Sequence, residues 1–184
     1  MGKINIVLCG LGGQGILFMT KVLARTALAK GLHVLGAETH GMAQRGGSVV
    51  SHLRLGDVNS SLVNTGECHH LLALEENEAC RNLPFLARGA QLYVNTTSSR
   101  FPPNRVRYYL EDKKIEYHTV AAAKLALDLA APMAANLALI GFMAAQAESP
   151  FSAAEIRATI AAVSPERFKP TNFKVFDAGA AAGT

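Results

Sequence analysis

The order of apolar and polar positions along this chain predicts strands and helices in alternation. Short apolar runs that end at glycine or polar residues are typical of buried strands, whereas a 3.6-residue period indicates a helix. This alternation favours the α/β class. The strands are predicted at residues 4–8, 32–38, 49–55, 70–74, 90–95 and 115–120, with a short further strand at 58–63. The helices are predicted at residues 16–28, 75–83, 121–130 and 133–146, and another starts after residue 152.

A glycine turn joins the first predicted strand to the first predicted helix. Its sequence, Cys-Gly-Leu-Gly-Gly-Gln-Gly at residues 9–15, contains the spacing Gly-x-Gly-x-x-Gly between a strand and a helix. Glycines allow a tight turn, and the unpaired N–H groups of the helix N-terminus suit a phosphate. The alternative is that these glycines only let the helix pack closely on the strand. The apolar stripe of this helix, which we expect to face the sheet, is Ile16, Met19, Leu23 and Ala27.

The first two strands and the helix between them form a predicted right-handed, Rossmann-like βαβ unit. The link from there to the strand at 49–55 is shorter than a parallel crossover requires, so that strand is expected to return antiparallel. An antiparallel strand at this position departs from a standard dinucleotide fold. It therefore weakens the hypothesis that Glu38 is a ribose-binding acid. The glycine turn and the segment after Glu38 are then expected to meet at one edge of the sheet.

The segment at 39–48 is the second informative loop, because it is rich in glycine and in polar side chains. Its backbone N–H groups, with those of the glycine turn, can cradle phosphates, and Arg45 can pair with one. Arg45 can equally tie the loop to Glu38 or to a partner chain. His40 is expected to form local hydrogen bonds rather than to act as a base. Asn95 begins a polar loop that is predicted to lie on the same edge.

The remaining segments are predicted in less detail. Residues 101–104 are expected to form a rigid, extended connector. Ser152 and Glu155 have the spacing of a capping box. A short element is predicted at 171–176, and the tail at 178–184 is expected to fray. With no linker or repeat, the chain is predicted to form one domain over residues 1–184.

Composition narrows the function classes. Of the 184 residues, 49% are hydrophobic and 17% are charged, which indicates a folded globule. No apolar run reaches the ~18 residues of a membrane span. The first strand follows Met1 too closely for a signal peptide, so we expect a cytoplasmic protein. The net charge of +4 favours an anionic ligand or partner, but the scattered basic residues do not indicate nucleic acid.

The cysteines and histidines do not predict a metal centre. Cys9, Cys68 and Cys80 are far apart, and none belongs to a Cys-x-x-Cys pair, so an iron–sulfur cluster or a zinc ribbon within this chain is not expected. Cys9 is expected to be a small core residue. His69 and His70, adjacent in a strand, are predicted to point to opposite faces and so not to share an ion.

The two glycine-rich loops resemble a known family. Residues 10–15 (Gly-Leu-Gly-Gly-Gln-Gly) and 40–49 (His-Gly-Met-Ala-Gln-Arg-Gly-Gly-Ser-Val) are similar to the gamma domain of 2-oxoacid:ferredoxin oxidoreductases, above all to the small (beta) subunit of the indolepyruvate enzymes. Further similar patches extend to residues 172–179. The resemblance implies a three-layer α/β/α fold with a mixed, mostly parallel sheet.

The resemblance also implies an activity. In this family, a 2-oxoacid and coenzyme A give acyl-CoA, carbon dioxide and reduced ferredoxin. The implied chain is a non-cofactor subunit, inactive alone, that helps to bind coenzyme A. Its implied partner is a large alpha subunit that carries thiamine diphosphate, magnesium and [4Fe-4S] clusters, and ferredoxin is the acceptor. The alternative is an independent nucleotide-binding α/β module or oxidoreductase that uses the glycine turn.

The resemblance implies binding residues mainly in the two glycine-rich loops. Residues 97–101 are where variation with the substrate is expected. Expected contacts with the substrate or the partner are Glu38, Thr39, His40 and Met42. Expected contacts with coenzyme A are Gly10, Gly12, Gly13, Gln14, Gly15, Gln44, Arg45, Gly46, Gly47, Ser48 and Asn95.

Overall fold

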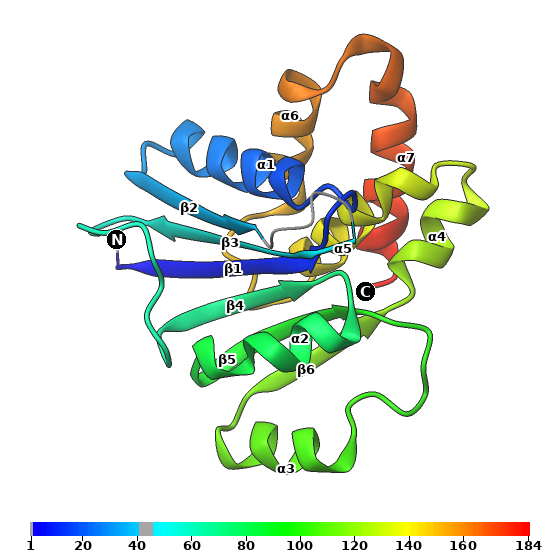
Figure 1. Ribbon diagram of the computed structural model, residues 1–184. Helices are drawn as coiled ribbons and strands as arrows, with labels where there is room; N and C mark the ends of the chain where they lie inside the picture. The colour runs from blue at the N-terminus through cyan, green and yellow to red at the C-terminus, as the bar shows by residue number, and fades with distance from the viewer. Residues whose placement is uncertain (1, 41–45) are drawn as a thin grey trace.

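A computed structural model describes residues 2–40 and 46–184, and it contains a six-stranded sheet with the order β2-β3-β1-β4-β5-β6 (Figure 1). β3 pairs antiparallel with both β1 and β2, whereas β4, β5 and β6 continue parallel to β1. The predicted antiparallel return strand and the mixed, mostly parallel sheet are therefore confirmed. The strands are β1 (Ile4–Leu11), β2 (Val34–His40), β3 (Ser48–Leu55), β4 (Cys68–Ala73), β5 (Leu86–Asn95) and β6 (Glu116–Val120).

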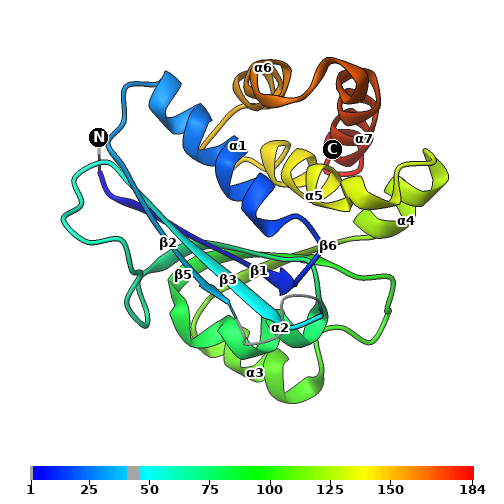
Figure 2. The same ribbon diagram turned by 45° about the horizontal axis from the view of Figure 1, so that its top comes forward.

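Helices cover both faces of the sheet, as Figure 2 shows. On one face, α1 and α5 contact the strands, and α4, α6 and α7 pack onto them. On the other face lie α2 and α3. The α-helices are α1 (Ile16–Ala29), α2 (Glu76–Asn82), α3 (Asn104–Asp112), α4 (Ala122–Asp128), α5 (Ala135–Ala144), α6 (Ala153–Val163) and α7 (Lys169–Ala181). Short 3-10 turns lie at Leu83–Phe85, Pro132–Ala134 and Glu166–Phe168.

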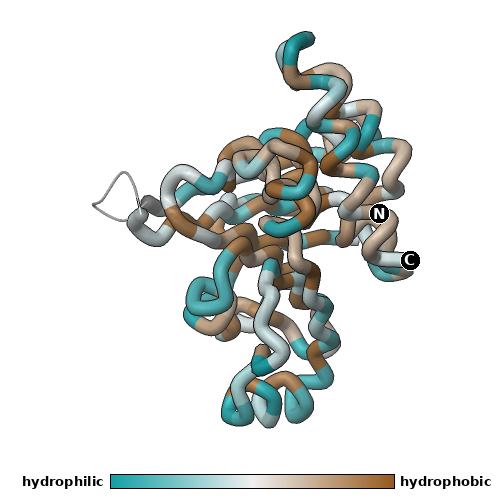
Figure 3. Tube along the Cα trace, turned by 90° about the vertical axis from the view of Figure 1, so that its right-hand side faces the viewer, coloured by the Kyte–Doolittle hydropathy of each residue, from teal (hydrophilic) through white to brown (hydrophobic). Residues whose placement is uncertain are grey.

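The sheet separates two hydrophobic cores, because neighbouring residues of a strand point to opposite faces. Leu8 and Tyr93 lie in the core beneath α1 and α5, whereas Val7 and Leu92 lie in the core beneath α2 and α3. The predicted stripe of the first helix is confirmed, since its four residues are all buried in the first core. Burying each of the larger side chains, Ile16, Met19 and Leu23, stabilises the fold by about 1.5–3 kcal/mol. Figure 3 shows the apolar stretches through the middle of the molecule.

The prediction of a short strand at 58–63 is wrong. Instead of pairing with a strand, the backbone of this segment bonds to side chains of β3. Arg54, which is buried, donates to the carbonyl oxygen of Leu62 at 3.1 Å. The N–H of Val63 donates to His52 Nδ1 at 3.2 Å. Local side-chain partners of this kind compete with sheet pairing, so the alternation of apolar residues was not sufficient to specify a strand.

The prediction of an extended connector at 101–104 was also incomplete, because it did not include α3 (Asn104–Asp112), which begins at its last residue. Only Leu110 of this helix is fully buried, so its apolar signal is weak. The tail likewise differs from the prediction, since α7 continues to Ala181 where fraying was expected. The cause is a close helix contact in which Gly179 lies against the backbone of Ala138 in α5. A buried contact of this kind orders a terminus that its sequence alone leaves unsupported.

Candidate functional site

The two glycine-rich loops meet at the carboxyl edge of the parallel strands, as expected. The N–H of Gly12 donates to the carbonyl oxygen of Gly47 at 2.8 Å, and the N–H of Gly46 donates to the carbonyl oxygen of Gly12 at 3.2 Å. These bonds continue the β1–β3 ladder beyond Leu11 and Ser48. They also occupy two of the N–H groups that the sequence assigned to a phosphate cradle. Among the predicted site residues, Met42, Gln44 and Arg45 lie outside the described residues, as does the side chain of His40.

Gln14 shapes the glycine turn from within. Its Oε1 accepts from the N–H of Leu11 at 2.8 Å, and its Nε2 donates to Glu75 Oε1 at 2.6 Å. The side chain therefore folds back over β1, and an added Cβ at Gly10 would lie only 2.7 Å from Gln14 Oε1. A larger residue at position 10 would therefore displace the Gln14 side chain. Both ends of the Gln14 amide are engaged within the chain, so the side chain contributes to the shape of the site.

Asn136 holds the last glycine of the turn, and sequence reasoning gave it no role in the site. Gly15 has a φ of +79°, and Asn136 Nδ2 donates to its carbonyl oxygen at 3.1 Å. The amide is oriented by the N–H of Leu137, which donates to Asn136 Oδ1 at 2.8 Å. Asn136 is buried at the start of α5. The available signal was a carboxamide at the start of an otherwise apolar helix, because buried polar groups require partners.

Asn95 joins three elements at the same edge. Its Nδ2 donates to the carbonyl oxygen of Leu74 after β4, at 3.1 Å. Its Oδ1 accepts from the N–H of Ala123 in the first turn of α4, at 2.9 Å. Asn95 therefore lies within the edge, as expected, and both ends of its amide are hydrogen-bonded within the chain.

A buried carboxylate anchors the second loop. Ser48 Oγ donates to Glu78 Oε2 at 2.6 Å, and Arg81 forms an ion pair with Glu78 at 2.6 Å. Glu78 lies in α2 and is almost completely buried. Burial, and secondly the charge of Glu78, raise the pKa of the Cys9 thiol well above its ordinary range. The predicted core role of Cys9 is confirmed, because this residue is fully buried.

Glu38 and Thr39 lie on β2, the edge strand of the sheet. β3 separates β2 from β1, so Glu38 is two strands away from the glycine turn. Thr39 Oγ1 donates to the carbonyl oxygen of Val50 at 3.3 Å. The insertion of β3 explains why Glu38 does not occupy the position of a ribose-binding acid, which requires the strand beside β1.

Two hollows open beside the glycine turn. A cavity of about 160 Å³ is lined by Gln14, Glu75 and Asn95, and a larger apolar one of about 650 Å³ is lined by Phe18 and Phe168. Gly13 lines both, and an added Cβ there would meet no heavy atom within 4 Å. The first turn of α1 carries no acidic residue. An anion is therefore favoured on the α1 side of Gly13, while the Glu75 carboxylate disfavours one on the other side.

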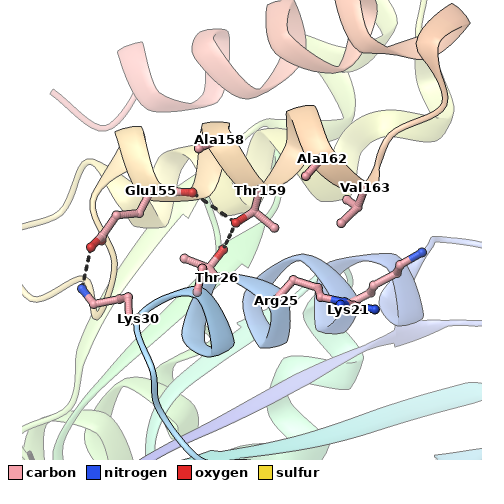
Figure 4. Close-up of a pocket in the computed structure, with 10 residues that line it drawn as sticks. Lys21, Arg25, Thr26, Lys30, Glu155, Ala158, Thr159, Ala162 and Val163 are labelled. Atoms are coloured by element: carbon pink, nitrogen blue, oxygen red, sulfur yellow. Dashed lines mark hydrogen bonds and ion pairs between the residues drawn. The ribbon is translucent and has the colours of Figure 1, made fainter.

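A groove of about 690 Å³ lies elsewhere, between α1 and α6 (Figure 4). Thr26 Oγ1 donates to Thr159 Oγ1 at 2.9 Å across it, and Lys30 pairs with Glu155 at 2.7 Å. The capping box predicted at Ser152 is confirmed, with both of its hydrogen bonds present. This groove contains none of the predicted site residues, so it does not belong to the candidate site.

Metal-ligating groups and membrane-spanning helices are both absent from the described ranges, 2–40 and 46–184. Within them, no three His, Cys, Asp or Glu residues are grouped as a metal ion would require. No helix there is both long and apolar enough to cross a membrane.

Taken together, the sheet order and the paired glycine loops define a Rossmann-like α/β protein whose candidate site lies at one edge of a mixed sheet. The sequence matches the family described as pyruvate ferredoxin/flavodoxin oxidoreductase over residues 5–182, and the chain belongs to this family. The predicted family resemblance is confirmed.

Individual relatives agree with this assignment. The chain is 33% identical to the indolepyruvate oxidoreductase subunit IorB of Archaeoglobus fulgidus, over 96% of this chain and 94% of the relative. Its fold matches a keto/oxoacid ferredoxin oxidoreductase gamma subunit from Geobacter sulfurreducens with a TM-score of 0.77, at 22% identity and 98% coverage of both chains. The predicted fold class and the prediction of an oxidoreductase subunit are confirmed.

A third match is to part of a longer chain. The 2-oxoglutarate:ferredoxin oxidoreductase from Magnetococcus marinus, solved with 2-oxoglutarate, coenzyme A and succinyl-CoA bound, matches with a TM-score of 0.78 at 16% identity. The match covers 100% of this chain but 31% of that one. At this identity, the similarity establishes the fold alone.

Proposed function

We propose that this chain is the small, non-cofactor subunit of a 2-oxoacid:ferredoxin oxidoreductase whose substrate is indolepyruvate or a related arylpyruvate. The complex oxidatively decarboxylates the 2-oxoacid to an acyl-CoA and reduces ferredoxin. The observation that carries the proposal is the full-length similarity to a relative named as an indolepyruvate oxidoreductase subunit. The partner is a large alpha subunit, and the chain helps to complete the active site of that subunit.

The carboxyl edge is the proposed contact with coenzyme A. The phosphates of coenzyme A fit the N-terminal end of α1, where Gly13 and Gly15 bring the backbone close and no first-turn acid repels an anion. Gln14 and Asn136 hold this backbone in place, and Asn95 ties the neighbouring segments after β4 and at the start of α4 together. Arg45, which lies outside the described residues, is proposed to supply the cation. The choice of ligand is supported by the Magnetococcus marinus relative, which was solved with coenzyme A bound.

The redox cofactors are proposed to lie on the partner, because the thiols of this chain do not fit them. Cys9 and Cys68 are fully buried in strands, and burial raises the pKa of the Cys68 thiol to about 12. Iron–sulfur clusters need thiolates, which such burial disfavours. The [4Fe-4S] clusters are therefore assigned to the large subunit. Thiamine diphosphate and magnesium are proposed to lie there too, as the family resemblance implies, and no step of the chemistry is assigned to residues of this chain.

The proposal is tested by reconstitution. The chain alone is expected to show no turnover, and mixing it with its large subunit is expected to restore 2-oxoacid-dependent ferredoxin reduction. Activity of the large subunit that is unchanged by this chain would contradict the proposal. Calorimetry of the chain with NAD, FAD and coenzyme A tests the alternative of an independent nucleotide-binding module, which predicts tight binding of a nucleotide without any partner.

A further inference from the structure

A further pocket lies at the opposite edge of the sheet from the glycine loops. It has a volume of about 320 Å³, near the lower end of the range for small-molecule sites. It lies where β1, β4 and β5 begin, so the length of these parallel strands separates it from the carboxyl edge. We call it the amino-edge pocket. Its lining residues are Lys3, Ile4, His69, His70, Ala87, Arg88, Gly89, Ala90, Gln91 and Glu148.

An irregularity in β5 builds one wall of this pocket. In the β4–β5 pairing, Cys68 lies opposite Leu86, but His70 lies opposite Gln91, so the register shifts between these pairs. The extra residues form a bulge, and Gly89, with a φ of +75°, donates from its N–H to the carbonyl oxygen of Lys113 at 3.0 Å. The bulge interrupts the regular ladder and brings Arg88 to the pocket. Bulges often re-aim side chains beside functional sites.

Two buried polar side chains of this region have unmet hydrogen-bonding capacity. His70 is 8% exposed and Tyr93 is fully buried. His70 Nδ1 and the Tyr93 hydroxyl make no hydrogen bond within the part of the chain that the structure describes. The rings of His70 and Tyr93 are stacked, with centroids 6.3 Å apart. Buried polar atoms without partners are uncommon in folded proteins, so this pair requires an explanation.

The neighbouring polar groups do not supply the missing partners, because they are engaged with one another. His118 Nε2 lies 2.8 Å from Gln91 Oε1, and Gln91 Nε2 donates to Glu116 Oε2 at 3.2 Å. His118 also stacks on Tyr93 on the side of β6. Of the two side chains with an unpaired polar atom, His70 lines the pocket and Tyr93 does not.

The pocket carries charges of both signs. Arg88 is exposed and forms no ion pair within the described residues, whereas Lys3 pairs with Glu67 at 3.3 Å. Glu148 follows α5 and lines the pocket, and its charge adds to burial in raising the pKa of the Tyr93 hydroxyl. Burial, and secondly the charge of His69, lower the pKa of His70 to about 4, so its ring is neutral near pH 7.

We propose that the amino-edge pocket binds a small α-amino acid, with its carboxylate at Arg88, its ammonium group at Glu148 and a hydrogen bond to His70. A simple anion is disfavoured by Glu148, and a simple cation is disfavoured by Arg88 and Lys3. A zwitterion satisfies both charges at once. The proposal is independent of the function proposed above, because it concerns the opposite edge of the sheet.

The test is a thermal-shift screen of the full chain against each standard L-amino acid at millimolar concentration, followed by calorimetry on those that stabilise it. At least one amino acid is expected to raise Tm by about 3 °C. For that amino acid, the matching 2-oxo acid lacks the ammonium group and the matching amine lacks the carboxylate. Both analogues are expected to bind at least about tenfold more weakly. Inorganic phosphate is the probe for a simple anion site.

Variants locate the binding. Arg88→Gln and Glu148→Gln are each expected to weaken binding by at least about tenfold, because each removes one charge partner. Arg105→Gln, at an exposed arginine of α3, is the matched control and is expected to bind normally. The imidazole NMR signals of His70, assigned by their loss in His70→Gln, are expected to shift on binding. The proposal is overturned if no amino acid binds, if the 2-oxo acid or phosphate binds equally well, or if neither charge variant weakens binding.

Discussion

The Asn136 carboxamide donates a hydrogen bond of 3.1 Å to the carbonyl oxygen of Gly15 and so ties the start of α5 to the glycine turn. The residues are 121 positions apart in the sequence. Removing the Asn136 side chain leaves the Gly15 carbonyl oxygen with its bonds from the N–H groups of Phe18 and Met19, but it takes away the side-chain acceptor of the Leu137 N–H and the tie between α5 and the turn. We expect Asn136→Ala to lower the free energy of unfolding by about 1–3 kcal/mol. Asn59→Ala, at an exposed asparagine, is the control in the same urea titration, and equal losses in both variants would contradict this role.

Gly15 is predicted to tolerate no side chain. Its φ is +79°, and an added Cβ would collide with Asn136 Nδ2. Gly66 has a φ of +76°, but its Cβ would meet no heavy atom within 4 Å. We therefore expect Gly66→Ala to cost only the backbone strain, about 1–2 kcal/mol. Gly15→Ala should cost distinctly more because Asn136 must also move. Equal unfolding free energies for the two variants would show that the collision is relieved without cost.

The contact between α5 and α7 predicts whether Gly141→Ala stabilises or destabilises the protein. An added Cβ at Gly141 would collide with the carbonyl oxygen of Phe176. Helix propensity alone predicts that Gly141→Ala stabilises α5 by about 0.5–1 kcal/mol. We expect the opposite, a loss of about 1–3 kcal/mol or more, because the backbones must separate. Gly36→Ala, whose Cβ would lie 3.5 Å from its nearest neighbour, is the control. Stabilisation by Gly141→Ala in thermal denaturation would contradict the close contact.

His70 gives a prediction about pH. Its pKa is lowered from the ordinary 6.5 to about 4, chiefly by burial, so the unfolded chain binds a proton more readily than the folded chain does. The His70 contribution to stability is therefore present above pH 6.5 and is lost as the pH falls towards 4. Between about pH 7.5 and pH 5 the loss is roughly 2 kcal/mol.

The measurement is urea unfolding at both pH values for the wild type and for His70→Gln. The variant should lose less stability on acidification, because glutamine does not titrate. Burial also lowers the pKa of His52 and His118, and these contributions act on both proteins equally. An identical pH dependence in the two proteins would show that His70 is not the responsible group.

Arg45 is predicted to contact coenzyme A in the assembled enzyme. We expect Arg45→Ala to raise the KM for coenzyme A about tenfold, or about 1.4 kcal/mol, with a smaller effect on the KM for the 2-oxoacid. Arg105→Ala serves as the charge-matched control. If the KM for coenzyme A is unchanged while assembly with the large subunit weakens, Arg45 belongs to the interface between subunits.

Much of the fold was predictable because the strongest signals are local. The strand before the glycine turn and the stripe on α1 both follow from the spacing of apolar residues. The antiparallel return of β3 followed from the length of one link. The helix α3 was missed because Leu110 is its only fully buried residue, so little apolar periodicity marks it. The end of α7 was missed because its support comes from Ala138, far away in the sequence.

The candidate site was predictable in place but not in its internal bonding. The glycines at 10–15 and 46–47 predict backbone that closely approaches another group. In the structure, that group is the backbone of the other glycine loop. Gln14 and Asn95 were assigned to a ligand on their residue type, and both carboxamides are hydrogen-bonded within the chain. No local pattern indicates that Asn136 reaches Gly15, since that contact depends on how α5 packs. Their roles towards coenzyme A stay predictions.

The packing of Gly179 against Ala138 has a consequence for the order in which this edge forms during synthesis. Asn136, which braces the glycine turn, lies 121 positions after Gly15, and its helix α5 packs against α7, which comes later still. The turn is therefore synthesised long before its brace, and this edge attains its mature form only once α7 has left the ribosome. A partner that recognises the finished edge is expected to join after that point, and not before it.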